Sequence, residues 1–349
     1  MPVINENELK LQIKSAEFSN LYFIYGEEKY LVKHYLSLLD KKIVDPAFAD
    51  FNKHIYDGKT VSLDDVAVAA EALPMMSDYA CIIIKDLQVD SLNSEDVDKL
   101  INIIKDIPET TVIVIALLTY DLNKKGAKFK QLMDAFVKYG SVVEFSHFTL
   151  QQLGKLVEKG ARERGCSIDF STANYLFSLI GDDMTVVLNE LEKICAYKKE
   201  GAITRQDVDA VVVKSMQARA FDLAKALVAN NCDTAMSILD TLISMKEEPI
   251  NILGAIITPY VDMYRAKVYL SGGLRAEDAA KDFTSYRNKE FRLTNGAKSS
   301  SKYSMSQLRS FLEILFEADA MLKSTSVNSR LILEQTITKL LLVSNGEKL

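Results

Sequence analysis

Cysteine and histidine are scarce in this sequence of 349 residues, which has four cysteines and three histidines. The cysteines lie far apart and show neither a metal-binding spacing nor a redox pair. They are Cys81, Cys166, Cys195 and Cys232. None of the histidines is followed four residues later by a ligand-type residue, and metal sites need clustered ligands. We therefore expect no metal site, and we expect the cysteines to be buried, reduced thiols of a cytoplasmic protein.

Long hydrophobic runs are missing as well. No stretch reaches the roughly 18 apolar residues that a membrane span needs, and residues 1–10 are polar and acidic, unlike a signal peptide. We therefore expect no contact with a membrane. The net charge of −6 is unlike that of free-standing nucleic-acid-binding proteins, which are usually basic. Any contact with DNA would have to come from a local patch or from partner proteins.

The composition is that of a globular protein, with 48% hydrophobic and 26% charged residues. At this length we expect two or three domains. In residues 1–146, short apolar runs that predict strands alternate with amphipathic runs that predict helices. The predicted strands are residues 21–25, 50–56, 80–84, 110–118 and 142–145. Strands separated by helices predict a parallel α/β sheet.

The rest of the chain has helical patterns. Residues 147–215 predict a small helical domain, and Thr204 with Asp207 resembles a capping box that opens its last helix. Residues 214–220 resemble a linker. Residues 216–349 predict a second helical domain, with a proline suited to the first turn of one helix. Its predicted helices are 221–229, 232–245, 250–269, 276–283, 306–322 and 328–343.

The first strand ends where a nucleotide-binding sheet would carry its phosphate loop. Such a loop needs several glycines, whose N–H groups wrap phosphate, followed by lysine and serine or threonine. This chain has Gly26-Glu27-Glu28-Lys29-Tyr30-Leu31, with one glycine and two carboxylates that would repel ATP. Residues 117–121 lack the paired acids that would hold magnesium. We infer a nucleotide-binding type of fold without nucleotide chemistry or any other cofactor.

A proline and two methionines stand between a helical run, residues 62–73, and a strand-like run, residues 79–85. Junctions of this kind are usually at the surface. An exposed apolar pair, Met75 and Met76, would then be covered by a partner. The alternative is that both methionines fill gaps in the core, which is the commoner use of methionine.

Several segments taken together resemble the delta subunit of the bacterial DNA polymerase III clamp loader. They occur in the family's order and span nearly the whole chain, and the match at residues 181–194 is the most specific. The segments are Leu21 to Glu28 with Tyr30-Leu31, Leu73 to Asp78 leading to Ile82-Ile83-Ile84-Lys85, Gly181-Asp182-Asp183 with Leu188 to Ile194, Phe221-Asp222-Leu223, and Ala318-Asp319 with Leu322-Lys323-Ser324.

The resemblance implies three domains. Residues 1–146 would be an AAA+-like parallel-sheet domain without a phosphate loop, residues 147–215 a small helical lid, and residues 216–349 a helical collar. The collar would join the other clamp-loader subunits (gamma/tau and delta prime) in a five-membered ring. The chain would be part of a polymerase holoenzyme that carries out nucleotidyl transfer, although we find no catalytic residues in the chain itself.

The resemblance also implies a function. The delta subunit binds the ring-shaped sliding clamp (beta subunit) and opens it for loading onto primed DNA in replication, without binding ATP itself. The clamp contact falls on Leu73, Pro74, Met75 and Met76. Many relatives have phenylalanine in the apolar pair, and this chain has none. Methionine adapts its shape, so we expect the pair to fit the clamp's hydrophobic pocket, in place of the core role that the pattern alone favours.

Two basic clusters are possible DNA contacts, since cations interleaved with aromatic residues hold phosphate and stack bases. The aromatic residues of the second cluster are Tyr286, Phe291 and Tyr303. The basic residues are Lys124, Lys125, Lys128 and Lys130 in the first cluster, and Arg287, Lys289, Arg292, Lys298 and Lys302 in the second. A solvated basic face is at least as good an explanation. Two other functions stay open, a nucleotide-dependent AAA+ ATPase and a helical scaffold protein outside replication.

Overall fold

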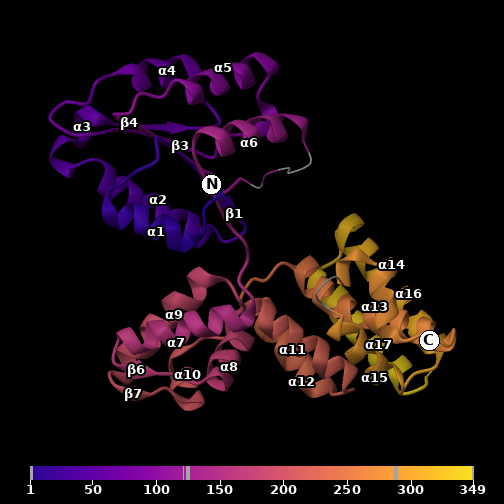
Figure 1. Ribbon diagram of the computed structural model, residues 1–349. Helices are drawn as coiled ribbons and strands as arrows, with labels where there is room; N and C mark the ends of the chain where they lie inside the picture. Colours follow the sequence, from indigo (N-terminus) through magenta and orange to yellow (C-terminus); the bar gives the residue numbers. More distant parts are fainter. Residues whose placement is uncertain (1–2, 121, 123–125, 287–289, 348–349) are drawn as a thin grey trace. The chain divides into compact units, whose positions relative to one another are not determined.

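The computed structural model describes residues 3–120, 122, 126–286 and 290–347. Internal contacts divide the chain into two compact units, residues 1–153 and 154–349 (Figure 1). The finer division at residues 146 and 215 stays a prediction.

The first unit is built on a five-stranded sheet of order β2-β3-β4-β1-β5, in which every neighbouring pair is parallel. This confirms the predicted parallel α/β sheet. The strands are β1 (Leu21–Gly26), β2 (Lys53–Asp57), β3 (Ala80–Lys85), β4 (Thr111–Ala116) and β5 (Ser141–Phe145). The three inner strands are almost wholly buried, as expected of a parallel sheet with both faces covered.

Helices cover both faces of this sheet (Figure 1). They are α1 (Glu6–Ser15), α2 (Lys29–Ile43), α3 (Ala49–Asn52), α4 (Leu63–Glu71), α5 (Ser94–Lys105) and α6 (Ala127–Tyr139), with 3-10 turns at Pro46–Phe48 and Val89–Ser91. α4, α5 and α6 pack on alternate strand residues such as Phe23, Ile82 and Ile113, and α2 lies against the sheet on the other side. The strand predicted at residues 50–56 is displaced, because residues 49–52 form the short helix α3 before β2.

The second unit is mostly helical. Its first part contains α7 (Leu150–Glu163), α8 (Phe170–Ile180), α9 (Met184–Lys198) and α10 (Arg205–Val211). The sequence did not reveal a small parallel sheet here, formed by β6 (Cys166–Ser167) and β7 (Gly201–Ala202). Thr204 and Asp207 form the predicted capping box at the start of α10.

The remaining helices pack in two apolar clusters, a large one and a small one formed by Ala279, Tyr286 and Leu293. They are α11 (Met216–Val228), α12 (Cys232–Ser244), α13 (Pro249–Ser271), α14 (Ala279–Asp282), α15 (Phe291–Ser300), α16 (Met305–Ser324) and α17 (Ser329–Ser344), with 3-10 turns at Ala276–Asp278 and Thr284–Tyr286. The linker predicted at residues 214–220 is wrong, since α11 begins at Met216 behind the N-cap Ser215. No helix in the described part of the chain combines the length and apolarity that crossing a bilayer requires.

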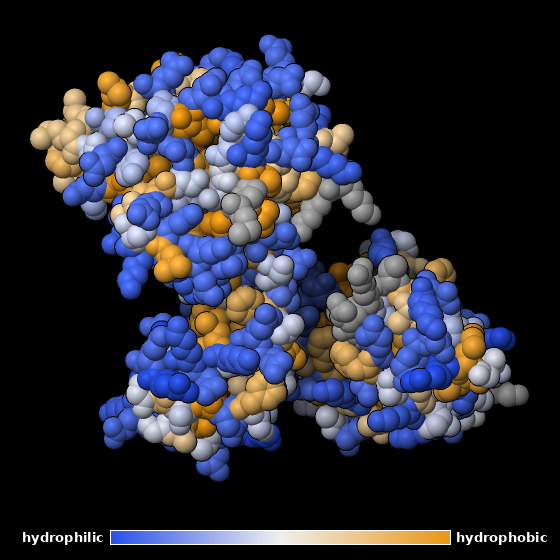
Figure 2. Space-filling model, in the orientation of Figure 1, coloured by the Kyte–Doolittle hydropathy of each residue, from blue (hydrophilic) through white to orange (hydrophobic). Residues whose placement is uncertain are grey.

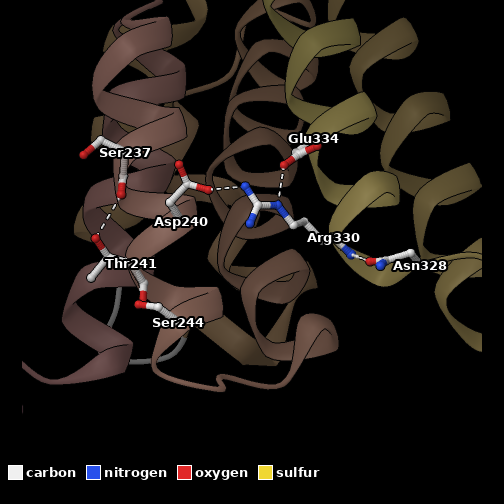
Figure 3. A network of polar contacts seen from close by, with 7 residues as sticks. All are labelled: Ser237, Asp240, Thr241, Ser244, Asn328, Arg330 and Glu334. Atoms are coloured by element: carbon white, nitrogen blue, oxygen red, sulfur yellow. Dashed lines mark hydrogen bonds and ion pairs between the residues drawn. The ribbon is translucent and has the colours of Figure 1, made fainter.

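A polar network on the surface joins two of these helices (Figure 3). Arg330 of α17 donates to Asp240 of α12 and to Glu334 one turn further along α17, each at 2.6 Å. All three side chains are at least partly exposed, so water competes with the pairing and the network contributes little to stability. It links α17 to α12 at the surface and lies outside the core.

Candidate functional site

The loop between α4 and β3, residues 72–79, carries the apolar pair. Leu73 is 86% exposed, Met75 55% and Met76 79%. In Figure 2, apolar surface gathers at the left end of the first unit, where Figure 1 draws α3. The alternative in which both methionines fill the core is therefore wrong. We call residues 73–76 the tip.

A buried asparagine holds the tip. Asn52, the last residue of α3, is 1% exposed. Its Oδ1 accepts from the backbone N–H of Met75 at 2.6 Å, and its Nδ2 donates to the Met75 carbonyl at 2.8 Å. Nδ2 also donates to the carbonyl of Phe48 at 3.2 Å. The amide thus pairs with both backbone groups of Met75, its N–H and its carbonyl, much as a residue of a neighbouring strand would.

Contacts at the carboxyl end of the loop, next to β3, also hold its backbone. Met76 has φ 52°, the left-handed region that non-glycine residues rarely occupy. Tyr79 packs edge-on against Phe18, with ring centroids 5.7 Å apart. The backbone N–H of Ala80 donates to the carbonyl of Thr110 at 2.8 Å. The loop therefore has a defined backbone although its apolar side chains point into solvent.

Sequence reasoning missed the contribution of α3. Phe51, next to Asn52, is 64% exposed and adds an aromatic ring to the apolar surface at this end of the unit. Residues 50–56 resembled a strand, so neither residue stood out. The signal available in the sequence was a polar residue, Asn52. Its burial between a helix and a strand becomes apparent only in the folded structure.

The region after β1 lies at the opposite end of the parallel strands, their carboxyl end. Gly26 has φ 141°, and a Cβ there would overlap the carbonyl oxygen of Phe145. Glu28 is buried, with its Oε2 3.7 Å from Nδ1 of His147. Lys29 Nζ donates to the carbonyl of Tyr120 at 3.0 Å. A cavity of about 510 Å³ opens here, lined by the carboxylate of Glu27 and by Lys29, whose ammonium group is held by a carbonyl, in place of phosphate-binding groups.

The possible DNA contacts lie in different settings. Lys128 donates to the carbonyl of Leu92, and Arg292 makes two 2.9 Å hydrogen bonds to the buried carboxylate of Asp262. Lys298 and Lys302 are exposed. Lys124, Lys125, Arg287 and Lys289 lie outside the described residues.

The aromatic residues of the second basic cluster differ in exposure. Tyr286 and Tyr303 are buried, so the expected stacking of bases on these two rings is wrong. Phe291 is exposed. The fold has used both tyrosines for packing, and only the phenylalanine offers a ring to solvent.

The cysteines depart from expectation at one position, since Cys232 is exposed. The other three are buried. Burial raises the pKa of the Cys195 thiol to about 11, as does its neighbour Cys166, with which it forms a hydrogen bond. Such a thiol is almost fully protonated at neutral pH and therefore a poor nucleophile. No group of three or more metal-ligating side chains occurs among the described residues.

A five-stranded parallel sheet of this order, followed by helical bundles, defines an AAA+-like protein. Two family models then specify the family. One, described as DNA polymerase III, delta subunit, matches residues 22–145, and its C-terminal domain model matches residues 217–340. A further model, described as a middle domain, matches residues 149–210. The chain belongs to the DNA polymerase III delta subunit family of clamp-loader subunits.

Individual relatives agree with this assignment. DNA polymerase III subunit delta of Bacillus subtilis (strain 168) is 22% identical over 335 residues, 94% of this chain and 95% of the relative. The probable DNA polymerase III subunit delta of Aquifex aeolicus (strain VF5) is 22% identical over 256 residues, 71% and 70% of the two chains. The solved Bacillus subtilis DNA clamp loader delta protein has the same fold, with a TM-score of 0.61 and 22% identity over 96% of this chain and 99% of that chain.

Proposed function

We propose that this chain binds the ring-shaped sliding clamp through its tip and opens the ring for loading onto primed DNA, without binding ATP itself. The observation that carries the proposal is the exposure of Leu73, Met75 and Met76 on an ordered loop. Large apolar side chains gathered at one exposed loop are typical of protein contact sites. The tip lies at the position that the family resemblance assigns to the clamp contact.

The tip suits a hydrophobic pocket on the partner. Full burial of one methionine side chain contributes about 1.5–3 kcal/mol, and the cost of association is subtracted from the sum. Methionine is unbranched and polarizable, so Met75 and Met76 adapt to a pocket that phenylalanine fills in many relatives. Pro74 limits the conformational freedom of the backbone between Leu73 and the two methionines.

Opening the clamp requires more than affinity. A ligand shifts an equilibrium only by the difference between its affinities for the two states. The tip therefore binds the clamp edge more tightly when the interface between clamp subunits is open or strained. The buried Glu28 and the engaged Lys29 make the region after β1 unsuited to ATP, so the energy of a cycle comes from ATP on neighbouring subunits.

The collar, residues 216–349, supplies the contact with the gamma/tau and delta prime subunits, and residues 147–215 form the lid. Phe316 of α16 is exposed and is a natural position for such a contact. Primed DNA is reached within the assembled ring. We place this work in the cytoplasm, where the chromosome is replicated.

The test measures clamp binding without ATP. We expect the double variant Met75→Ala/Met76→Ala to weaken the affinity of the full-length chain for the purified clamp by about 100-fold or more, since two buried side chains are lost at roughly tenfold each. The unfolding temperature and assembly with the other loader subunits should not change, because both side chains are exposed in the free chain. Titration calorimetry gives the dissociation constant.

The matched control is Leu11→Ala, which removes an exposed leucine of α1 in the same unit. Its clamp affinity should equal that of the wild type. A Met75→Ala/Met76→Ala variant that binds the clamp as tightly as the wild type would overturn the proposal.

A further inference from the structure

The buried side-chain amide of Asn52 forms hydrogen bonds with the backbone of a distant loop. Its three hydrogen bonds all go to backbone groups, one of Phe48 and two of Met75, which is 23 residues away in sequence. A buried side-chain amide without partners is costly, so the loop and α3 must be in register for the fold to hold it. The amide thus links the backbone of the tip directly to the amino end of the sheet.

The hydrogen bonds from Asn52 matter for the conformation of the loop of residues 72–79. Residues 72–79 present three large apolar side chains to solvent, those of Leu73, Met75 and Met76. Met76 also adopts a left-handed backbone conformation, which costs free energy and persists only where surrounding contacts impose it. The two hydrogen bonds between Asn52 and the backbone of Met75 lie directly before that residue.

We propose that Asn52 is the positioning residue of the tip, which keeps the backbone of Met75 and Met76 in the clamp-binding conformation before the clamp arrives. This inference rests on the proposed function. A preorganised loop binds more tightly because it does not pay the ordering entropy during association. Removing the amide frees at least one residue's backbone, so we expect the affinity for the clamp to fall by about tenfold.

The first variant is Asn52→Ala in the full-length chain, measured by titration with the purified clamp. Hydrogen exchange of the Met75 amide, which donates to Asn52, is measured alongside. We expect faster exchange at Met75, unchanged exchange in β1 and β4, and about tenfold weaker binding. If Asn52→Ala does not fold, Asn52→Ser serves the same purpose, because its hydroxyl is too short to pair with the Met75 peptide.

Asn20→Ala is the matched control. The Asn20 amide also holds a loop at this edge of the sheet, donating to the carbonyls of Pro108, Glu109 and Thr111 at 2.9–3.1 Å. It should lower stability without changing the affinity for the clamp. A residue that only supports the fold would behave in the same way at position 52.

A double-mutant cycle separates this inference from the proposed function. On the Met75→Ala/Met76→Ala background, Asn52→Ala should change residual clamp binding no further, since the tip that it positions is gone. If Asn52→Ala binds as tightly as the wild type while Met75→Ala/Met76→Ala is weak, the positioning role is wrong and the tip remains the contact. If Met75→Ala/Met76→Ala itself binds normally, the proposed function fails first.

Discussion

Asp207 shows how a local motif becomes a measurable property of one residue. Its carboxylate accepts from Lys198 Nζ at 2.9 Å and from the backbone N–H and hydroxyl of Thr204. The hydrogen bond from Lys198, and then those from Thr204, lower its pKa from 3.8 to about 2. The folded state thus holds this proton less tightly than the unfolded chain. The resulting stability is present above pH ~4 and is lost as the pH falls toward 2.

We expect Asp207→Asn to be less stable than the wild type at pH 7, with the difference shrinking as the pH falls from ~4 to 2. The asparagine keeps an acceptor for Thr204 and loses the charge that attracts Lys198. Thermal unfolding followed by circular dichroism at several pH values measures the difference. Glu192→Gln, an exposed position on α9, is the control and should follow the wild-type curve. A constant difference at every pH would contradict the assigned cause.

Residues of this kind differ in how readily the sequence reveals them. Thr204 was predicted as part of a capping box because a cap and its partners lie within four residues. Met75 and Met76 were predicted as a possible contact because proline and the ends of two elements mark a junction. Asn52 was not predicted, since its partner Met75 is 23 residues away and only the neighbouring strands β2 and β3 bring them together.

Between elements, α13 and α15 of the second unit pack closely. A Cβ at Gly296 of α15 would lie 2.8 Å from the backbone of Asp262 in α13, so the two helices approach without a side chain between them. Beside this contact, buried Asp262 receives two hydrogen bonds from Arg292 and one from the hydroxyl of Tyr286 at 2.7 Å. Arg292 therefore holds α15 on α13.

We expect Arg292→Leu to lower the free energy of unfolding by roughly 3 kcal/mol, since it leaves a buried carboxylate without its cation. Chemical denaturation of the full-length chain measures this loss. The control, Arg330→Leu, removes the cation of the exposed network in Figure 3 and should cost much less. Adding Asp262→Leu to Arg292→Leu should recover part of the loss. Equal losses in the two single variants would show that burial does not set the strength of these pairs.

The elements that sequence patterns missed share a physical reason. α15 contains Thr294, Asn295 and Gly296, which form helices poorly, and its conformation depends on packing against α13. β6 and β7 have two residues each, too few for any alternation to be seen. Four strands of the first unit were found because their apolar runs are bounded by polar turns, whereas β2, Lys53–Asp57, is mostly polar and was predicted too early in the chain. Patterns thus reveal elements that carry their own signal and miss those that depend on a distant neighbour.

At the scale of the whole molecule, the proposed clamp contact and the region where a nucleotide would bind lie at opposite ends of the parallel strands. The tip precedes β3 at the amino edge, and the region after Gly26 lies at the carboxyl edge, where parallel sheets usually bind ligands. Here that end carries the buried Glu28 and Lys29, whose ammonium group is hydrogen-bonded to a backbone carbonyl. The proposed clamp contact therefore does not share its position with a nucleotide, and binding to the clamp is expected to be independent of ATP.

DNA contact, if it occurs, belongs to the assembled loader, because the chain alone carries a net charge of −6. Lys298 and Lys302 are exposed on or just after α15, and both were predicted as DNA contacts. Each phosphate contact contributes about −0.9 to the slope of log K against log salt concentration.

We expect Lys298→Glu/Lys302→Glu to weaken binding of the loader to primed DNA and to reduce the magnitude of that slope by about 2, with clamp affinity unchanged. Fluorescence anisotropy at several salt concentrations gives the slope, and Lys225→Glu, which reverses an exposed lysine of α11, is the matched control. A slope equal to that of the wild type would mean that the two lysines belong to a solvated basic face, since reversing the charge of a phosphate contact necessarily alters counterion release.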